Sequence, residues 1–82
     1  MNINQRLKEL IVNVATNDID VDNINEKTIL TTDLGYDSVQ IIGLIVELEN
    51  EFHIEIEDDD LEIENLTVFI KLLEMIERKT KE

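Results

Sequence analysis

The sequence has no cysteine, no proline and no tryptophan, and only two glycines. Without cysteine the chain has no disulfide, no thiolate metal ligand and no thiol for covalent catalysis. Any thioester chemistry would therefore need a sulfur atom from a bound group. The sequence also lacks internal repeats, low-complexity tracts and alternating apolar patterns long enough to favour a sheet, apart from residues 53–57.

Basic residues are scarce. Seven lysines and arginines stand against 20 acidic residues, which gives a net charge of −13, and no lysine or arginine occurs from Thr28 to Ile70. Nucleic acids and anionic membranes would repel such a protein, so neither is an expected partner. The charge instead predicts partners with basic surface patches, steered toward the acidic middle of the chain.

The length and hydrophobic content suit one small core. With 82 residues, 43% of them hydrophobic, we expect a single domain over residues 1–82. No apolar run approaches the ~20 residues of a membrane-spanning helix, so stable membrane insertion is not expected. The first residues do not resemble a secretory leader. We therefore expect a soluble, cytoplasmic protein, and a monomer.

Apolar residues recur at helical spacing in three stretches, which predicts an all-α fold. A further short helix is expected where the acidic residues 57–60 can occupy a cap and a first turn. Residues 53–57 are interpreted as a loop in which Ile54 and Ile56 plug the core. The expected long helices cover residues 4–15, 38–52 and 67–79, and a long loop covers residues 18–33.

The second long helix, residues 38–52, is apolar over too wide an arc for one buried stripe. Val39, Gly43 and Val46 lie on a separate face, which something should cover part of the time. Gly43 costs about 1 kcal/mol relative to alanine inside a helix. Either close approach of another molecule or relief of crowding in the core would explain it. The residues expected on the core side are Ile41, Leu44, Ile45 and Leu48.

The segment from Asp33 to Val39 carries the best candidate for chemistry. Gly35 can adopt the positive φ that a tight turn needs, and a helix can begin directly afterwards. Asp37 is a good N-cap, and Gln40 three residues later completes a pattern like a capping box. Ser38 then lies at the first helical position with its hydroxyl outward, where the helix end favours an anion such as a phosphate ester.

The sequence Leu34-Gly35-Tyr36-Asp37-Ser38-Val39 resembles the phosphopantetheine attachment site of the acyl carrier protein family, with Val39 in place of the usual leucine. The resemblance extends over nearly the whole chain. It implies a four-helix bundle with a long first loop and a short third helix. It also implies a non-enzymatic carrier, whose 4′-phosphopantetheine arm is attached to Ser38 by a phosphopantetheinyl transferase in a Mg²⁺-dependent reaction.

The same resemblance implies that acyl or aminoacyl groups travel as thioesters on the arm, between loading, condensing and tailoring enzymes. Asp37 would cap the helix and help to hold the metal or meet a basic group of the transferase. In the family, acidic residues of this helix contact basic enzyme surfaces, but two matching positions here are Gln40 and Gly43. This departure predicts a pathway with its own partners as an alternative to ordinary fatty acid synthesis. The expected docking face comprises Val39, Gln40, Gly43, Val46 and Glu47.

The sequence offers three alternatives to a carrier. A serine hydrolase would need a base near Ser38, but the one histidine, His53, lies beyond the other end of the helix, roughly 20 Å away. The Asp18-x-Asp20-x-Asp22 pattern imitates a calcium loop, yet its sixth and twelfth positions lack the required glycine and glutamate. We therefore expect no metal site. An acidic interaction or divalent-cation-binding module without a prosthetic group is the remaining alternative.

Overall fold

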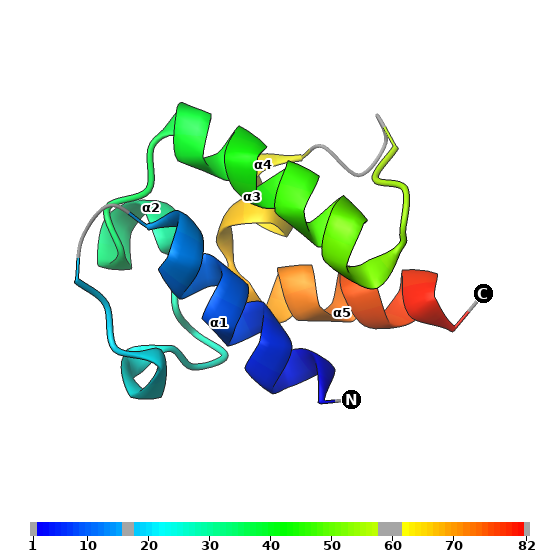
Figure 1. Cartoon of the computed structure of the whole chain (residues 1–82). Helices are drawn as coiled ribbons and strands as arrows, with labels where there is room; N and C mark the ends of the chain where they lie inside the picture. Colours follow the sequence, from blue (N-terminus) through cyan, green and yellow to red (C-terminus); the bar gives the residue numbers. More distant parts are fainter. Residues whose placement is uncertain (1, 16–17, 58–61, 82) are drawn as a thin grey trace.

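The computed structural model describes residues 2–15, 18–57 and 62–81, and these residues are mainly helical (Figure 1). The longer helices are α1 (Ile3–Val14), α3 (Ser38–Phe52) and α5 (Phe69–Thr80). Two short helices, α2 (Leu30–Asp33) and α4 (Ile63–Thr67), precede α3 and α5 respectively. A 3-10 turn, η1 (Val21–Asn23), lies in the first connection. The all-α prediction is therefore confirmed.

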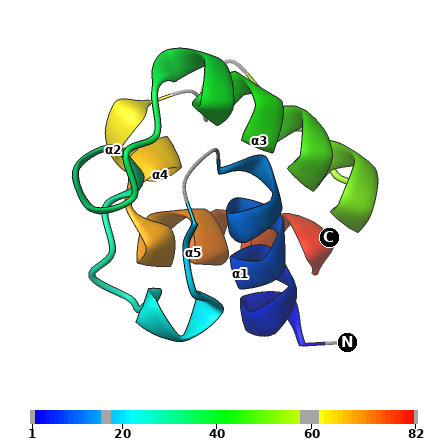
Figure 2. The ribbon, with the colours of Figure 1, turned by 60° about the vertical axis from the view of Figure 1, so that its left-hand side comes forward.

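The three longer helices meet around one apolar core. α1 contacts both α3 and α5, and Figures 1 and 2 show the three helices next to one another. α1 and α5 each bury one apolar side and keep a polar side opposite, whereas the apolar residues of α3 spread over a wider arc. Burial of these side chains is the main favourable term in the folding of such a small domain. The buried side chains of these helices are Leu7, Leu10 and Ile11; Leu44, Leu48 and Phe52; and Phe69, Leu72, Leu73, Met75 and Ile76.

The predicted helix bounds are close to the observed ones. α3 begins and ends where the sequence predicts, and α1 is shifted by a single residue at each end. α5 starts at Phe69 instead of Thr67, because Val68 is extended and pairs with Ile29 in an isolated antiparallel β-bridge. The Phe69 N–H donates to the Thr28 carbonyl at 2.9 Å. The connection between α1 and α3 is thus hydrogen-bonded to the junction of α4 and α5.

The interpretation of residues 18–33 as a loop is wrong in part, because the segment contains η1 and α2. Short polar side chains form these turns locally. The Asp20 carboxylate accepts from the Asp22 N–H at 3.0 Å, and the Asp33 carboxylate accepts from the Ile29 N–H at 2.8 Å. The bundle accordingly has the expected long helices and an additional one-turn helix, α2.

The short helix before α5 begins at Ile63, with Glu62 at the N-cap position. The predicted seed for this helix falls mainly on residues 58–60, which lie outside the described residues. Ile54 and Ile56 are half-buried and pack against the core, as the sequence predicts. No helix in the described ranges is long and apolar enough to cross a membrane.

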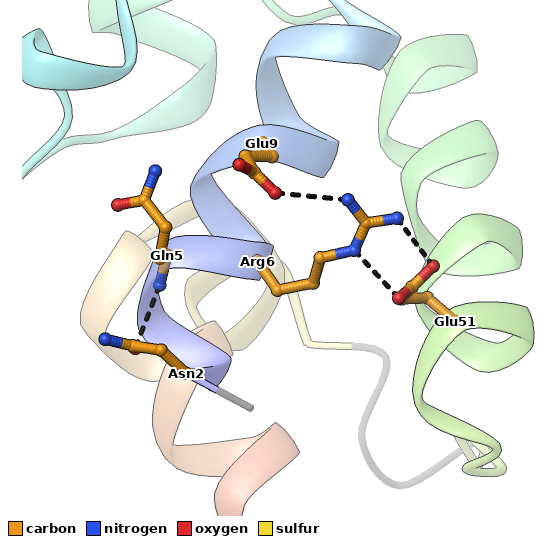
Figure 3. A network of polar contacts seen from close by, with 5 residues as sticks. All are labelled: Asn2, Gln5, Arg6, Glu9 and Glu51. Atoms are coloured by element: carbon orange, nitrogen blue, oxygen red, sulfur yellow. Dashed lines mark hydrogen bonds and ion pairs between the residues drawn. The ribbon is translucent and has the colours of Figure 1, made fainter.

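A polar network joins α1 to the C-terminal part of α3 (Figure 3). The Arg6 guanidinium donates two hydrogen bonds to the Glu51 carboxylate, at 2.8 and 2.9 Å, and a third to Glu9 at 3.1 Å. The bonds from Arg6 lower the pKa of Glu51, and the same contacts raise the pKa of Arg6. This bidentate pair fixes the relative position of the two helices with more geometric specificity than a lysine would give.

Candidate functional site

The turn before α3 is built from α2 and Gly35. α2 ends at Asp33 with Leu34 as its C-cap, and Gly35 then takes a φ of 74°, a conformation that glycine adopts without the steric cost of a side chain. The Tyr36 N–H donates back to the Leu30 carbonyl at 3.0 Å, which closes the turn. This turn reverses the chain and places the next residues at the start of α3.

The start of α3 is held by the predicted capping box. The Asp37 carboxylate accepts from the Gln40 N–H at 2.8 Å, and the Gln40 side-chain oxygen accepts from the Asp37 N–H at 3.0 Å. Ser38 is the first helical residue and is exposed, while the first turn of α3 has no acidic residue. The positive end of the helix dipole favours a negatively charged ester at this position. The residues present therefore fit a phosphodiester on the Ser38 hydroxyl.

An apolar groove begins beside Ser38. It lies between α3 and the segments of α2 and α4 and has a volume of about 370 Å³. Only Ser38 and the two threonines contribute hydroxyl groups to its lining. An apolar chain attached near Ser38 would find hydrophobic surface within reach. The lining residues are Thr31, Ser38, Ile41, Ile42, Ile45, Leu66 and Thr67.

The prediction of which α3 residues face the core is right only in part. Leu44 and Leu48 are buried, as expected, but Ile41 and Ile45 are only half-buried and line the groove while also packing against the core. The apolar arc of α3 is too wide for the core alone to cover it. The width of the apolar arc was evident from the sequence, but both residues were predicted to belong to the core.

A second apolar surface, which we call the outer face, comprises Val39, Ile42 and Val46. These side chains are 74%, 63% and 49% exposed. Apolar side chains grouped on one exposed helix face are typical of binding surfaces. Sequence analysis placed Val39 and Val46 on such a face but left out Ile42, although its spacing from both is helical.

The other residues of the predicted docking face have different surroundings. Glu47 is exposed, whereas Gln40 is half-buried and takes part in the capping box. Gly43 is half-buried at the side of α3 that faces α1, since a Cβ atom built there would lie 3.9 Å from Val14 Cγ1. This is an ordinary contact distance, so the helix packing does not demand glycine. Their role in docking stays a prediction.

Two further residues near α3 bear on what the site can do. His53 is the C-cap of α3, with a φ of 53°, and so lies at the opposite end of the helix from Ser38. It is therefore badly placed to act as a base for Ser38. Tyr36, by contrast, adjoins the site and was missed by sequence analysis. Its ring is buried, its hydroxyl donates to the Ile11 carbonyl, and burial raises the pKa of that hydroxyl.

A small helical bundle with an exposed serine at a capped helix start, next to an apolar groove, is the arrangement expected of a phosphopantetheine-bearing carrier. Comparison with known proteins gives the same result. Residues 5–73 match the family model for the phosphopantetheine attachment site. This match includes the whole of α3 and most of the chain.

Individual relatives agree. The chain is 34% identical over 80 residues to the acyl carrier protein of Buchnera aphidicola subsp. Schizaphis graminum, with 98% of this chain and 96% of that protein covered. It is 37% identical over 59 residues to the acyl carrier protein of Chlorobium phaeobacteroides, covering 70% and 76%. The chain belongs to the acyl carrier protein family. It is a carrier with a covalently attached 4′-phosphopantetheine, and not an enzyme.

Proposed function

We propose that Ser38 is the attachment residue and that the protein carries acyl chains as thioesters on the arm. The observation that supports this most strongly is the position of Ser38, exposed at the first turn of α3 and beside the apolar groove. When bound, the arm supplies the thiol that the sequence lacks. The protein's own residues then supply the attachment point, the anion-favouring helix end and the apolar surface.

Attachment requires a transferase, because nothing in the described surroundings of Ser38 activates its hydroxyl. Ser38 Oγ forms a bond to the phosphorus of coenzyme A that carries the pantetheine. The pyrophosphate P–O bond breaks, adenosine bisphosphate departs, and the hydroxyl proton passes to a base of the transferase. Asp37 lies directly before Ser38, and its carboxylate is engaged with the Gln40 N–H. We expect it to keep the helix start in place, and its remaining oxygen to meet the metal or a basic group of the transferase.

The first experiment tests attachment. Apo protein incubated with coenzyme A, Mg²⁺ and a broad-specificity transferase should gain the mass of one phosphopantetheine group, and Ser38→Ala should gain none. Thermal melts of both proteins control for folding. No addition to folded wild type, or equal addition to the Ser38→Ala variant, would reject Ser38 as the attachment residue and favour an acidic interaction module.

The groove supports an acyl cargo in preference to an aminoacyl one. An extended hydrocarbon is stabilised by about 0.8 kcal/mol for each CH₂ group that it buries, whereas a charged amino group would lose hydration in an apolar groove. We therefore infer that the cargo is an acyl chain of the kind made in fatty acid or polyketide synthesis. The acyl carrier protein names of the relatives suit this choice.

The second experiment tests the cargo. Loading the holo protein with octanoyl in place of acetyl should raise the melting temperature by several degrees, because about 1 kcal/mol corresponds to about 4–8 °C in a domain of this size. Ile45→Thr, which makes the groove more polar, should reduce that rise. Val46→Thr, on the outer face, should leave it unchanged. Equal melting temperatures for both loaded forms would mean that the cargo stays in solvent.

The outer face is the proposed docking surface for the transferase and the biosynthetic enzymes. It adjoins Ser38, and residues 28–70 contain no lysine or arginine, so acidic residues such as Glu47 would steer basic partners toward it. Val39, Ile42 and Val46 would then give the apolar contacts of the docked complex. Cytoplasmic location and a monomeric state stay predictions.

A further inference from the structure

Tyr36 is anchored at two points, although it lies in the turn between two helices. Its side chain is 4% exposed and its hydroxyl donates to the carbonyl of Ile11, in α1. Its backbone N–H donates to the carbonyl of Leu30, in α2, at 3.0 Å. One residue thus ties the turn both to the short helix before it and to the end of the first long helix.

Tyr36 is also the last such anchor before the attachment site. Gly35 precedes it, with a φ of 74° and no side chain to restrain the chain. Asp37 and Ser38 follow it and are both exposed. The Asp37 cap fixes the turn relative to α3 itself, but the hydroxyl of Tyr36 fixes it relative to α1.

We propose that the hydroxyl of Tyr36 is a positioning group, which holds the Ser38 turn against α1 and thereby sets the geometry in which the transferase meets Ser38. The proposal rests on the assignment of Ser38 as the attachment residue. Without this hydrogen bond, the turn would open more often by local unfolding, which is a property of a segment and not of the whole fold. A smaller population of the competent turn weakens apparent binding in proportion to the lost fraction.

The variant Tyr36→Phe separates the hydrogen bond from the packing of the ring. It leaves the Ile11 carbonyl with a second donor, because the Ala15 N–H also bonds to it at 3.1 Å. No buried acceptor is therefore orphaned, and the variant should fold. Loss of one neutral hydrogen bond typically changes an equilibrium by about fivefold. We expect the amide groups of the turn to exchange up to about fivefold faster, and KM for the apo protein to rise by at most about fivefold, with kcat unchanged.

Two matched controls lose stability without touching the turn. Ile76→Val and Leu73→Ala shorten buried side chains of α5, and together they bracket the small loss of melting temperature expected for Tyr36→Phe. Their KM values should equal that of wild type. Amide hydrogen exchange gives a second readout, because the N–H groups of Tyr36 and Gln40 should lose protection in Tyr36→Phe more than in either control.

Each result is decisive. A raised KM together with faster exchange at the turn, in Tyr36→Phe alone, supports the positioning role. A KM equal to that of the controls at matched melting temperature would reduce Tyr36 to an ordinary core residue and overturn the proposal. Mass analysis of wild type and Ser38→Ala is done first, so that failure of Ser38 as the attachment residue is seen separately from failure of Tyr36 as its anchor.

Discussion

The two sides of α3 differ in what covers their apolar residues. On the inner side, Leu44 and Leu48 are 1% and 0% exposed, packed in the core shared with α1 and α5. On the outer face, Val39 and Ile42 have comparable hydrophobic side chains but remain 74% and 63% exposed. α3 therefore carries both apolar residues that are buried in the core and apolar residues that the fold leaves exposed to solvent.

This difference shows how a small domain accommodates a binding surface. Exposed apolar groups cost solubility and add little to folding, and a group of them beside the proposed attachment serine is typical of a binding surface. The groove between the two sides is intermediate, because Ile41 and Ile45 touch the core and also line a space that an acyl chain can enter. Successive faces of one helix thus pack the core, line the proposed cargo groove and form the proposed docking surface.

The largest expected effect separates the inner side from the outer face by stability. Leu48→Ala should lower the free energy of unfolding by about 2–5 kcal/mol, because it leaves a cavity in the core. Val46→Ala should change it by less than about 0.5 kcal/mol, because its side chain is 49% exposed. Denaturant unfolding of both variants measures the difference.

The same pair should reverse its order in transfer kinetics. At a temperature where both variants are folded, Val46→Ala should weaken transfer of the acyl group to a partner enzyme more than Leu48→Ala does. Wild-type kinetics for Val46→Ala would remove that residue from the docking surface. A large loss of stability in the same variant would instead assign it to the core.

The features of α3 that depend on neighbours in sequence were predicted correctly. Its bounds and the capping box of Asp37 and Gln40 follow from residues within a few positions of one another. The assignment of Ile41 and Ile45 to the core is right only in part, because they pack against the core but also line the groove. Helical spacing tells which residues share a face, but only the positions of α2 and α4 decide that this face borders a groove.

Long-range contacts were beyond the reach of sequence reasoning. The late start of α5 depends on the bridge between Ile29 and Val68, and these residues are far apart in the chain. The contact of Tyr36 with Ile11 likewise spans 25 positions. Tyr36 occupies a variable position of the Leu34–Val39 motif, and no neighbouring residue in the sequence indicated that its hydroxyl would reach α1. Ile42, in contrast, was detectable from spacing alone.

The smallest expected effect concerns the polar contact on the α1 side of α3. Arg6 lowers the pKa of Glu51 below its usual value of 4.5, so the charged carboxylate is favoured in the folded state. A carboxylate with a depressed folded pKa contributes stability above its unfolded pKa, and that contribution is lost as the pH falls through the folded value. Glu51→Gln should therefore melt slightly lower than wild type at pH 7, and the two should converge as the pH falls through the lowered pKa of Glu51.

The effect should be small because both side chains are partly solvent-exposed, at 35% for Arg6 and 27% for Glu51, and exposed pairs are screened. Glu47→Gln provides the matched control, since it removes the same charge from an exposed position of α3. In a protein with a net charge of −13, that change relieves repulsion and should leave the melting temperature equal or slightly higher. Melting curves at several pH values and two salt concentrations decide the matter. If Glu51→Gln rises together with Glu47→Gln at pH 7, general repulsion outweighs the bond to Arg6, and the apolar core alone holds α1 against α3.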